Sequence, residues 1–253
     1  MTKVFKSITD WLKEREQIPN GKTLGFVPTM GALHEGHFSL IEKSIKDNDY
    51  TVVSIYVNPT QFNNKDDFEN YPDTFDEDLS ALENLKVDYC IYPSYDEIYK
   101  DSYKYKISEN DLSDKLCGVY RPGHFDGVLT IVMKLLNIVR ADRAYFGEKD
   151  YQQFLLIKGM ADAFFMKTEI IPLPTVRTKE GLAFSSRNKR LTKEELRKAL
   201  EFPKLLKSNF TDKEIEQKLS AQGFIVDYIA TINNRRFGAV HLGKVRLIDN
   251  VEI

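Results

Sequence analysis

The fold of this chain is decided by one stretch, GFVPTMGALHEGHFSL, which spans residues 25–40. Its first apolar residues predict a strand over residues 23–27 that Pro28 ends, and the glycines beyond it allow a tight turn. The apolar residues then recur at helical spacing, which predicts a helix over residues 36–47. The free N–H groups and the positive dipole end of that helix would face the turn. The stretch therefore predicts a phosphate site between a strand and a helix.

Two histidines, His34 and His37, stand at the predicted start of this helix in the pattern H-x-G-H, the signature of the nucleotidyltransferase superfamily. Both rings could donate hydrogen bonds to phosphate oxygens. A helix cap or a surface position is the competing explanation for either ring. A zinc pair is another, but no cysteine or further histidine lies close by in sequence to complete such a site.

The composition indicates a soluble, cytoplasmic protein. The 253 residues include 36 basic and 38 acidic side chains, which leave a net charge of −2, so no surface for nucleic acid is expected. Two cysteines, Cys90 and Cys117, provide no disulfide framework, and Cys90 lies in an apolar run that we expect to be buried. No long apolar run is present, so no membrane segment is expected.

Short apolar runs and amphipathic patterns alternate along the first part of the chain. We expect strands over residues 23–27, 51–57, 87–92, 141–146 and 167–173, and helices over 36–47, 74–85, 125–139 and 150–165. Strand, helix and strand in repetition predict a parallel sheet with helices on both faces. Ligands of such α/β sheets bind beyond the carboxyl ends of the strands, where the strand order reverses. Polar motifs that follow these strands are therefore candidates for the site.

After about Thr175 the pattern changes, which predicts a first domain over residues 1–175 and a small α+β lobe over residues 176–253. In the second lobe we expect two helices, followed by short strands over residues 224–231, 236–241 and 244–248, with a turn at Leu242-Gly243. Capping boxes, in which a hydroxyl precedes a glutamate by three residues, mark helix starts at Thr74, Thr192 and Thr211.

The motif V-N-P-T-Q-F, residues 57–62, follows the second predicted strand. Pro59 should stop the strand and expose the amides of Asn58 and Gln61 at its carboxyl end. A carboxamide can donate to a carboxylate or hydroxyl and accept from an amine, so Gln61 could contact two different substrates. An Asx turn satisfied by Asn58 alone is the competing explanation.

The motif F-G-E-K-D-Y-Q-Q, residues 146–153, follows the fourth predicted strand. Gly147 would give a ligand access to the backbone, and Lys149 would supply a positive charge for phosphate. Gln153 would face the same side as Lys149, one turn into the next helix. A lysine and an aspartate at a helix start can also be merely solvated. Farther along, the polar turn at residues 184–187, F-S-S-R, could close over a triphosphate or form ordinary serine turns.

Taken together, the motifs resemble the pantothenate synthetase family, whose members join pantoate to β-alanine with ATP. The motifs that carry this resemblance are P-T-M-G-A-L-H-E-G-H, V-N-P-T-Q-F, R-P-G-H-F-D-G-V, F-G-E-K-D-Y-Q-Q, G-L-A-F-S-S-R-N and R-L-I-D-N, in the family's order. The resemblance implies a Rossmann-like fold, a homodimer and a need for Mg²⁺. It also implies that the pantoate carboxylate attacks the α-phosphorus of ATP and that β-alanine then attacks the acyl adenylate.

The resemblance also assigns residues by position. ATP is expected to be held by Met30, Gly31, Ala32, Leu33, His34, Glu35, Gly36, His37, Gly147, Glu148, Lys149, Asp150, Val176, Phe184, Ser185, Ser186 and Arg187. Pantoate is expected to be held by Gln61, Gln153, Pro28, Met30, Ile131 and Val132, and β-alanine by Gln61. The expected catalytic groups are His37, which is the family's proton donor, His34, Lys149 and Arg187. Asp78 is a candidate ligand of Mg²⁺, or else an acid that complements a helix dipole.

Several features depart from the family pattern: Asp73 stands in place of an arginine, Phe184 of a methionine, Glu180 of an aspartate and His241 of an arginine, and the second lobe is short. Two other functions remain open. One is a nucleotidyltransferase that acts on a phosphorylated acceptor, and the other is a catalytically silent nucleotide-binding protein. A phosphorylated acceptor would call for arginines where Gln61 and Gln153 stand.

Overall fold

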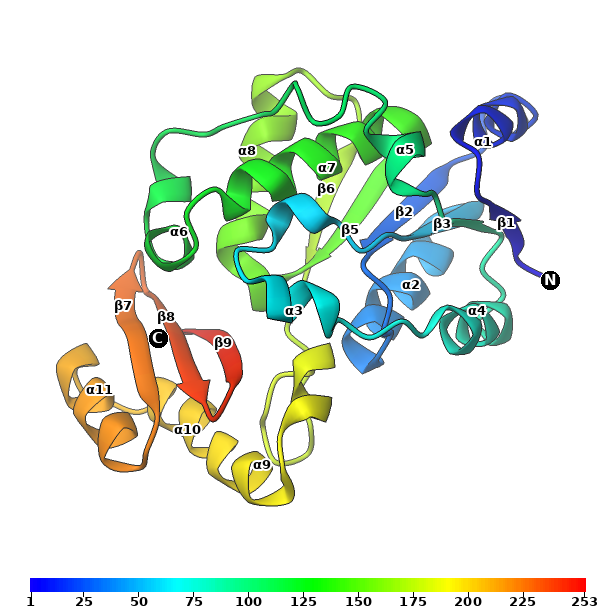
Figure 1. Cartoon of the computed structure of the whole chain (residues 1–253). Helices are drawn as coiled ribbons and strands as arrows, with labels where there is room; N and C mark the ends of the chain where they lie inside the picture. The colour runs from blue at the N-terminus through cyan, green and yellow to red at the C-terminus, as the bar shows by residue number, and fades with distance from the viewer.

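The computed structural model describes residues 1–253 and contains two separate sheets, one of six strands and one of three (Figure 1). The larger sheet and its helices use the chain up to Leu173, and the smaller sheet lies below it at the C-terminal end of the chain. No helix has the length and the apolar character that crossing a membrane requires. The expected parallel α/β sheet with a small α+β lobe is confirmed.

The large sheet is parallel throughout, in the strand order β1-β4-β3-β2-β5-β6. Its strands are β1 (Lys3–Phe5), β2 (Leu24–Thr29), β3 (Tyr50–Ile55), β4 (Tyr89–Ile91), β5 (Arg143–Gly147) and β6 (Glu169–Leu173). Five of them match predicted strands. β1 was not predicted, because three residues are too few to show an alternating pattern.

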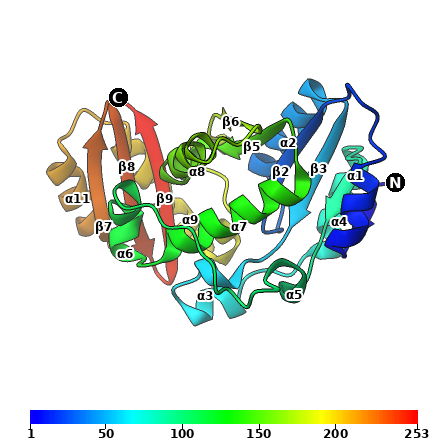
Figure 2. The same cartoon turned by 90° about the horizontal axis from the view of Figure 1, so that it is seen from above.

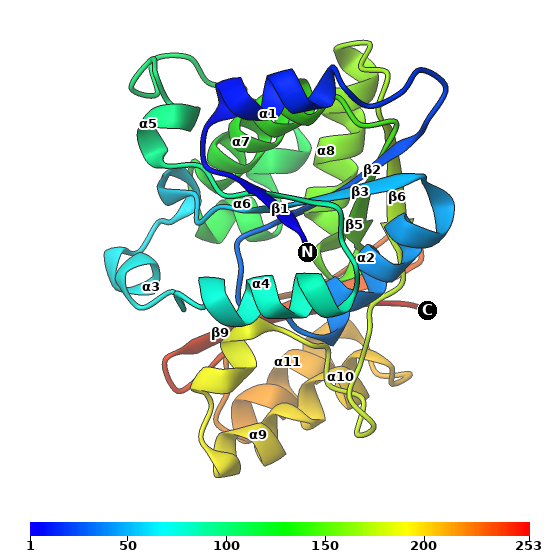
Figure 3. The ribbon, with the colours of Figure 1, turned by 90° about the vertical axis from the view of Figure 1, so that its right-hand side faces the viewer.

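Helices cover both faces of this sheet (Figure 3). One face carries α1 (Ile8–Arg15), α7 (His124–Val139) and α8 (Tyr151–Ala163), and the other carries α2 (Glu35–Asp47) and α4 (Phe75–Asn84). Each face therefore has its own apolar core, and Cys90 is fully buried in the second one, as expected. Short helices α3 (Lys65–Glu69), α5 (Tyr95–Ile98) and α6 (Cys117–Tyr120) and the turns η1 (Pro59–Gln61), η2 (Leu112–Asp114) and η3 (Glu148–Asp150) lie in the connections.

The strand order reverses between β2 and β5. From β2 the chain builds outward through β3 to β4, and β5 and β6 are then added on the other side of β2. Connections that leave neighbouring strands in opposite directions open a crevice at their carboxyl ends. The quoted stretch leaves β2 at this point, and the F-G-E-K-D motif leaves β5.

The strand β2 runs through Pro28 to Thr29, so the prediction that Pro28 ends it was wrong. Proline cannot donate a hydrogen bond within a sheet and is confined to positions with a free side. The ladder to β5 holds only at Gly25 and Phe26, so the strand is free of bonds on that side beyond Phe26. Pairing with β3 continues as far as Thr29.

The second lobe packs helices against one antiparallel sheet with β8 in its centre (Figure 2). Its elements are η4 (Ser186–Arg190), α9 (Lys193–Ala199), α10 (Glu201–Leu206), α11 (Asp212–Ala221), β7 (Ile225–Ile232), β8 (Arg235–Leu242) and β9 (Val245–Glu252). The structure has three helices here where two were predicted. β9 extends beyond the predicted strand because β8 pairs with it along its whole length.

The capping boxes at Thr192 and Thr211 are confirmed, since each hydroxyl and its glutamate bond reciprocally to the backbone. The box at Thr74 was wrong, although α4 does begin there. The Thr74 hydroxyl makes no cap bond; it donates to the Asp78 carboxylate and accepts from the N–H of Ala32. The side chain is therefore drawn into a tertiary contact.

Close packing of α7 on η1 depends on Gly127. A Cβ at this position would lie 2.4 Å from the carbonyl oxygen of Thr60 and 2.8 Å from the Cα of Gln61. Only glycine allows this approach. The contact holds η1, and with it Gln61, against α7.

We predict that Gly127→Ala lowers the free energy of unfolding by about 1–3 kcal/mol, because backbone atoms would have to move to make room. Gly159→Ala is the matched control. Gly159 is an exposed residue of α8, and a methyl group added there would meet open space, so alanine should raise the stability by about 0.5–1 kcal/mol. Equal effects of the two substitutions in chemical denaturation would refute the packing argument.

Candidate active site

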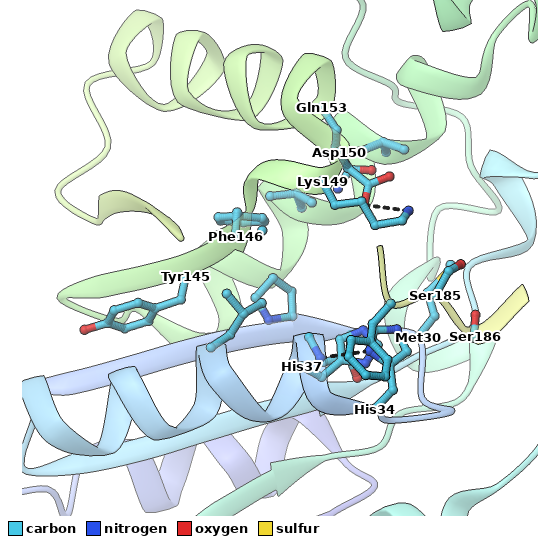
Figure 4. A pocket seen from close by; sticks show the side chains of 18 of the residues that line it. Met30, His34, His37, Tyr145, Phe146, Lys149, Asp150, Gln153, Ser185 and Ser186 are labelled. Carbon is cyan, nitrogen blue, oxygen red and sulfur yellow. Dashed lines mark hydrogen bonds and ion pairs between the residues drawn. The ribbon is translucent and has the colours of Figure 1, made fainter. Parts of the chain in front are cut away.

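A cavity of about 230 Å³ lies at the carboxyl ends of β2 and β5 (Figure 4). One wall comes from the end of β2 and the start of α2, another from β5, η3 and α8, and a third from α7 and η1. The loop after β6, which leads into the second lobe, supplies the remaining side. The cavity therefore occupies the crevice that the reversal of strand order creates.

Most of the residues expected from the sequence line this cavity. They are Pro28, Met30, His34, Gly36, His37, Gln61, Ile131, Val132, Gly147, Lys149, Asp150, Gln153, Val176, Phe184, Ser185, Ser186 and Arg187. The structure thus brings together groups from six segments of the chain. Those that do not line it are Gly31, Ala32, Leu33, Glu35, Glu148 and Asp78.

The turn after β2 does not present its backbone N–H groups to the cavity, which corrects the expectation for Gly31, Ala32 and Leu33. The Asp78 carboxylate accepts from the N–H groups of Ala32 and Leu33, both at 2.8 Å. The N–H of Gly31 donates to the hydroxyl of Thr29. At this wall only side chains and the start of α2 therefore face the cavity.

Asp78 supports the turn from behind and is not placed to be the expected Mg²⁺ ligand. The residue is only 4% exposed, and it also accepts a bond from the Thr74 hydroxyl, so its oxygens already have partners. No group of three or more acidic, histidine or cysteine side chains is placed to hold a metal ion. The buried carboxylate instead offsets the orphan N–H donors of the turn.

His34 and His37 lie against each other at the start of α2, with ring centroids 4.1 Å apart. The Nδ1 atom of His34 accepts from the N–H of Gly36 and caps the helix. A neutral His34 therefore carries its proton on Nε2, which is free to donate. The Nδ1 atom of His37 is buried without any partner. Protein atoms cover this nitrogen, so a ligand in the cavity does not reach it directly.

Both histidines are neutral in the free protein at neutral pH. Burial, together with the neighbouring Lys149, lowers the pKa of His34 to about 4. Burial, His34 and Lys149 lower the pKa of His37 to about 3. An anion bound beside them would favour the charged form and raise both pKa values.

Lys149, Asp150 and Gln153 reach the cavity from the opposite wall (Figure 4). The Lys149 Nζ atom lies 3.6 Å from the Asp150 carboxylate, and the lysine side chain is 19% exposed. The Gln153 amide faces the cavity one turn farther along and forms no hydrogen bond within the protein. A cation and a free amide thus stand on one wall, as the motif predicts.

Gln61 lies on the apolar side of the cavity, and a network that sequence reasoning missed fixes its orientation. Its Oε1 atom accepts from Asn58, and its Nε2 atom contacts the Met30 sulfur, a weak acceptor. Asn58 is 1% exposed and is also bonded to Tyr99 and Gly127, so the expectation that its amide is exposed was wrong. The N–H₂ group of Gln61 is therefore the part that can bind a ligand.

The backbone of Gln61 is held in turn by a buried histidine and a half-buried arginine. Its carbonyl oxygen accepts from the His124 Nδ1 atom at 2.7 Å and from Arg121 at 3.2 Å. Burial and the adjacent Arg121 lower the pKa of His124 to about 3, so this ring is neutral. The R-P-G-H motif thus supports the site without lining the main cavity.

The first segment of the second lobe brings Phe184, Ser185, Ser186 and Arg187 to the cavity. The Phe184 ring lies 6.3 Å from that of His34, so this departure from the family pattern still packs on the histidine pair. Arg187 is held by the carboxylate of Asp67, which also binds Arg190. Nothing in the sequence pointed to Asp67, an ordinary acid in the short helix α3.

The other departures lie away from the cavity lining. Asp73 is exposed, and Glu180 lies in an exposed turn. His241 stands 3.3 Å from the Asp227 carboxylate in the second lobe, where Arg246 also contacts that carboxylate.

Comparison with known proteins identifies the family. The model of the pantoate-beta-alanine ligase family matches residues 1–252. Pantothenate synthetases of Bdellovibrio bacteriovorus and Coxiella burnetii are 54% and 51% identical, over 100% and 99% of this chain and 100% and 97% of theirs.

Solved structures agree with this assignment. A Francisella tularensis pantoate-beta-alanine ligase, in complex with beta-gamma ATP and beta-alanine, is 42% identical with a TM-score of 0.96 and covers 100% of this chain and 98% of its own. Pantothenate synthetase from Thermus thermophilus is 32% identical with a TM-score of 0.90 and covers 99% of each chain. The chain belongs to the pantoate-beta-alanine ligase family.

Proposed function

We propose that this chain condenses pantoate with β-alanine to form pantothenate, with pantoyl adenylate as the intermediate and AMP and pyrophosphate as the by-products. Family membership over the whole chain supports the reaction. The observation that carries the site assignment is the pairing of two ligand-facing amides, Gln61 and Gln153, with a phosphate-facing wall of His34, His37 and Lys149 in one cavity. Such a cavity suits a small hydroxy acid beside a triphosphate.

In the first step a carboxylate oxygen of pantoate attacks the α-phosphorus of ATP, and the bond to the pyrophosphate oxygen breaks. Gln61 and Gln153 hold pantoate, while Ile131 and Val132 contact its apolar part. The chain contributes positioning and charge stabilisation. Neutral His34 donates a hydrogen bond to a phosphate oxygen, and Lys149 and Arg187 neutralise the charge that develops on the phosphates. The ATP charge raises the pKa of His37 and thereby lets it serve as a proton donor to the leaving oxygen.

In the second step the β-alanine amine attacks the acyl carbon of the adenylate, and the bond to AMP breaks. The amine must be neutral to attack, and the proton that it sheds must leave the cavity. The Gln61 N–H₂ group donates to the β-alanine carboxylate, which holds the amine near the acyl group and leaves its lone pair free. Burial of the cavity walls disfavours the charged ammonium form.

Mg²⁺ fits this site as a partner of ATP and not as a resident ion. No carboxylate cluster forms a cage, and the Asp78 oxygens already have partners. Asp150 is the one acidic side chain that lines the cavity, so it would share the ion with triphosphate oxygens and water. When bound, Mg²⁺ would neutralise charge on the phosphates.

We also propose that this chain forms a homodimer and is located in the cytoplasm.

The reaction is tested by product release. With Mg-ATP and pantoate, pyrophosphate should appear in an amount equal to the enzyme, because the adenylate stays bound. Addition of β-alanine should give continuous AMP release, and β-alanine alone should give none. Release only with a phosphorylated acceptor would support the alternative nucleotidyltransferase, and no release in any mixture would indicate a silent binding protein.

We predict that Gln153→Ala weakens pantoate binding by roughly 1.5–3 kcal/mol and spares ATP, because its amide faces a charged small substrate and no partner in the protein. The matched control is Gln152→Ala. The adjacent Gln152 amide is buried and bonds to the carbonyl groups of Leu112 and Lys115 and the N–H of Cys117. Its loss should lower the melting temperature and leave pantoate binding intact. Equal weakening of ATP and pantoate by Gln153→Ala in titrations would contradict the assignment.

We predict that His37→Ala lowers the single-turnover rate of adenylate formation on the order of 10²–10³-fold at saturating Mg-ATP, as expected for one lost preorganised donor. Binding of ATP should weaken far less. His241→Ala, at a more exposed ring in the second lobe, should leave the rate unchanged. A near-normal rate with a lowered melting temperature would show that His37 only supports the fold.

A further inference from the structure

The end of β9 carries two buried residues, Asp249 and Asn250, that close the R-L-I-D-N motif. Neither residue lines the main cavity, and the reaction described above uses neither of them. Each is 4% exposed, which is unusual for such polar side chains. β9 belongs to the second lobe, yet it packs beside η3 and α8 of the first (Figure 2).

The Asn250 side chain bonds to the turn that carries Lys149. Its Nδ2 atom donates to the carbonyl oxygens of Glu148 at 2.8 Å and Lys149 at 3.0 Å. Its Oδ1 atom accepts from Arg235 at 2.7 Å. The Arg235 guanidinium in turn lies 3.8 Å from the centre of the Tyr151 ring, at the first residue of α8. The N–H₂ group of this amide therefore holds η3 directly before α8, and its oxygen holds Arg235, which packs on the first residue of α8.

The neighbouring Asp249 holds the other phosphate-facing loop. Its carboxylate accepts two bonds from Arg177, at 2.6 and 2.9 Å. Arg177 follows Val176 and pairs with Ala183, so it joins the two ends of the loop that leads to Ser185 and Ser186. Adjacent residues of one strand thus fix both loops, one through a carboxylate and one through an amide.

The turn η3 has little internal stabilisation, so its backbone depends on bonds from other parts of the chain. It is a single turn of three residues, and no side chain caps it. Lys149 is a long, flexible side chain, so the place of its ammonium group depends on the backbone that carries it. Without the Asn250 amide, the carbonyl groups of Glu148 and Lys149 would lose their hydrogen-bond donor, and the backbone of η3 would shift to find other partners.

We propose that Asn250 is a positioning residue for the reaction, and that it acts by holding the backbone of Glu148 and Lys149 so that the Lys149 ammonium group meets the phosphates of ATP. The inference rests on the proposed function, since it needs a reaction in which Lys149 contacts phosphate. The competing explanation is that Asn250 only docks the second lobe on the first.

A double-mutant cycle separates these explanations. The single-turnover rate of pantoyl-adenylate formation is measured at saturating Mg-ATP and pantoate for Asn250→Ala, Lys149→Ala and the double variant. Asn250→Ala should lower the rate on the order of 10–10²-fold in the presence of Lys149, because small misplacements of a catalytic group have effects of this size. In the Lys149→Ala background the same change should have less than about a threefold effect, because the group that it positions is gone.

Two further variants guard against a loss of folding. Leu219→Ala removes a fully buried side chain from the core of the second lobe and should lower the melting temperature without lowering the rate. Asn250→Ser retains one donor, so it should fold and give a smaller rate loss than alanine, and it enters the cycle if Asn250→Ala does not fold. Equal fold-losses in both backgrounds, or a rate loss reproduced by Leu219→Ala, would overturn the inference. A wild-type chain that forms no adenylate would instead refute the proposed function.

Discussion

The hydrogen-bond ladder between β2 and β5 contains only two residue pairs, and the rest of the structure depends on the point at which this ladder ends. β2 stays bonded to β3 as far as Thr29, whereas its bonds to β5 end at Phe26. Beyond that point the two strands feed connections that leave in opposite directions, so their carboxyl ends are free to face a ligand. Met30 and the histidine pair come from one strand end, and Lys149 and Gln153 come from the other. A proline is tolerated in β2 for the same reason.

Charge in this cavity is arranged for a ligand that brings negative charge. Burial keeps the two histidines neutral by lowering their pKa values, because a charged ring would lose its hydration, and the positive charge of Lys149 adds to this effect. Arg187 is paired with Asp67 in the free protein, so its position is set before a ligand arrives. A triphosphate would therefore meet donors that are already oriented and need little reorganisation. This preorganisation is the physical basis for catalysis by a site that contains no nucleophile of its own.

The loops that border the cavity share one structural feature. Each is held from behind by a buried side chain that belongs to another part of the chain: Asp78 for the turn after β2, Asp249 for the loop after β6 and Asn250 for η3. Loops have few partners for their own N–H and carbonyl groups, and buried groups must find them elsewhere. The second lobe supplies two of these three supports. It therefore contributes to the site through its buried strand end as well as through the serine and arginine loop.

The sequence by itself determined the large-scale fold, the position of the crevice and most of the cavity lining. Strand and helix spacing is local, and so are motifs such as H-E-G-H and G-E-K-D that follow a strand end. What only the tertiary structure decided were the partners of these groups. Asp78 could not be separated from a metal ligand, because only the folded chain places it against the N–H groups of Ala32 and Leu33. Asp67 carried no local signal, and the R-L-I-D-N motif marked Asn250 without indicating its partners, since each residue acts on others about a hundred positions away along the chain. Contacts at such separations depend on how the lobes and loops pack, and spacing along one sequence does not encode that packing.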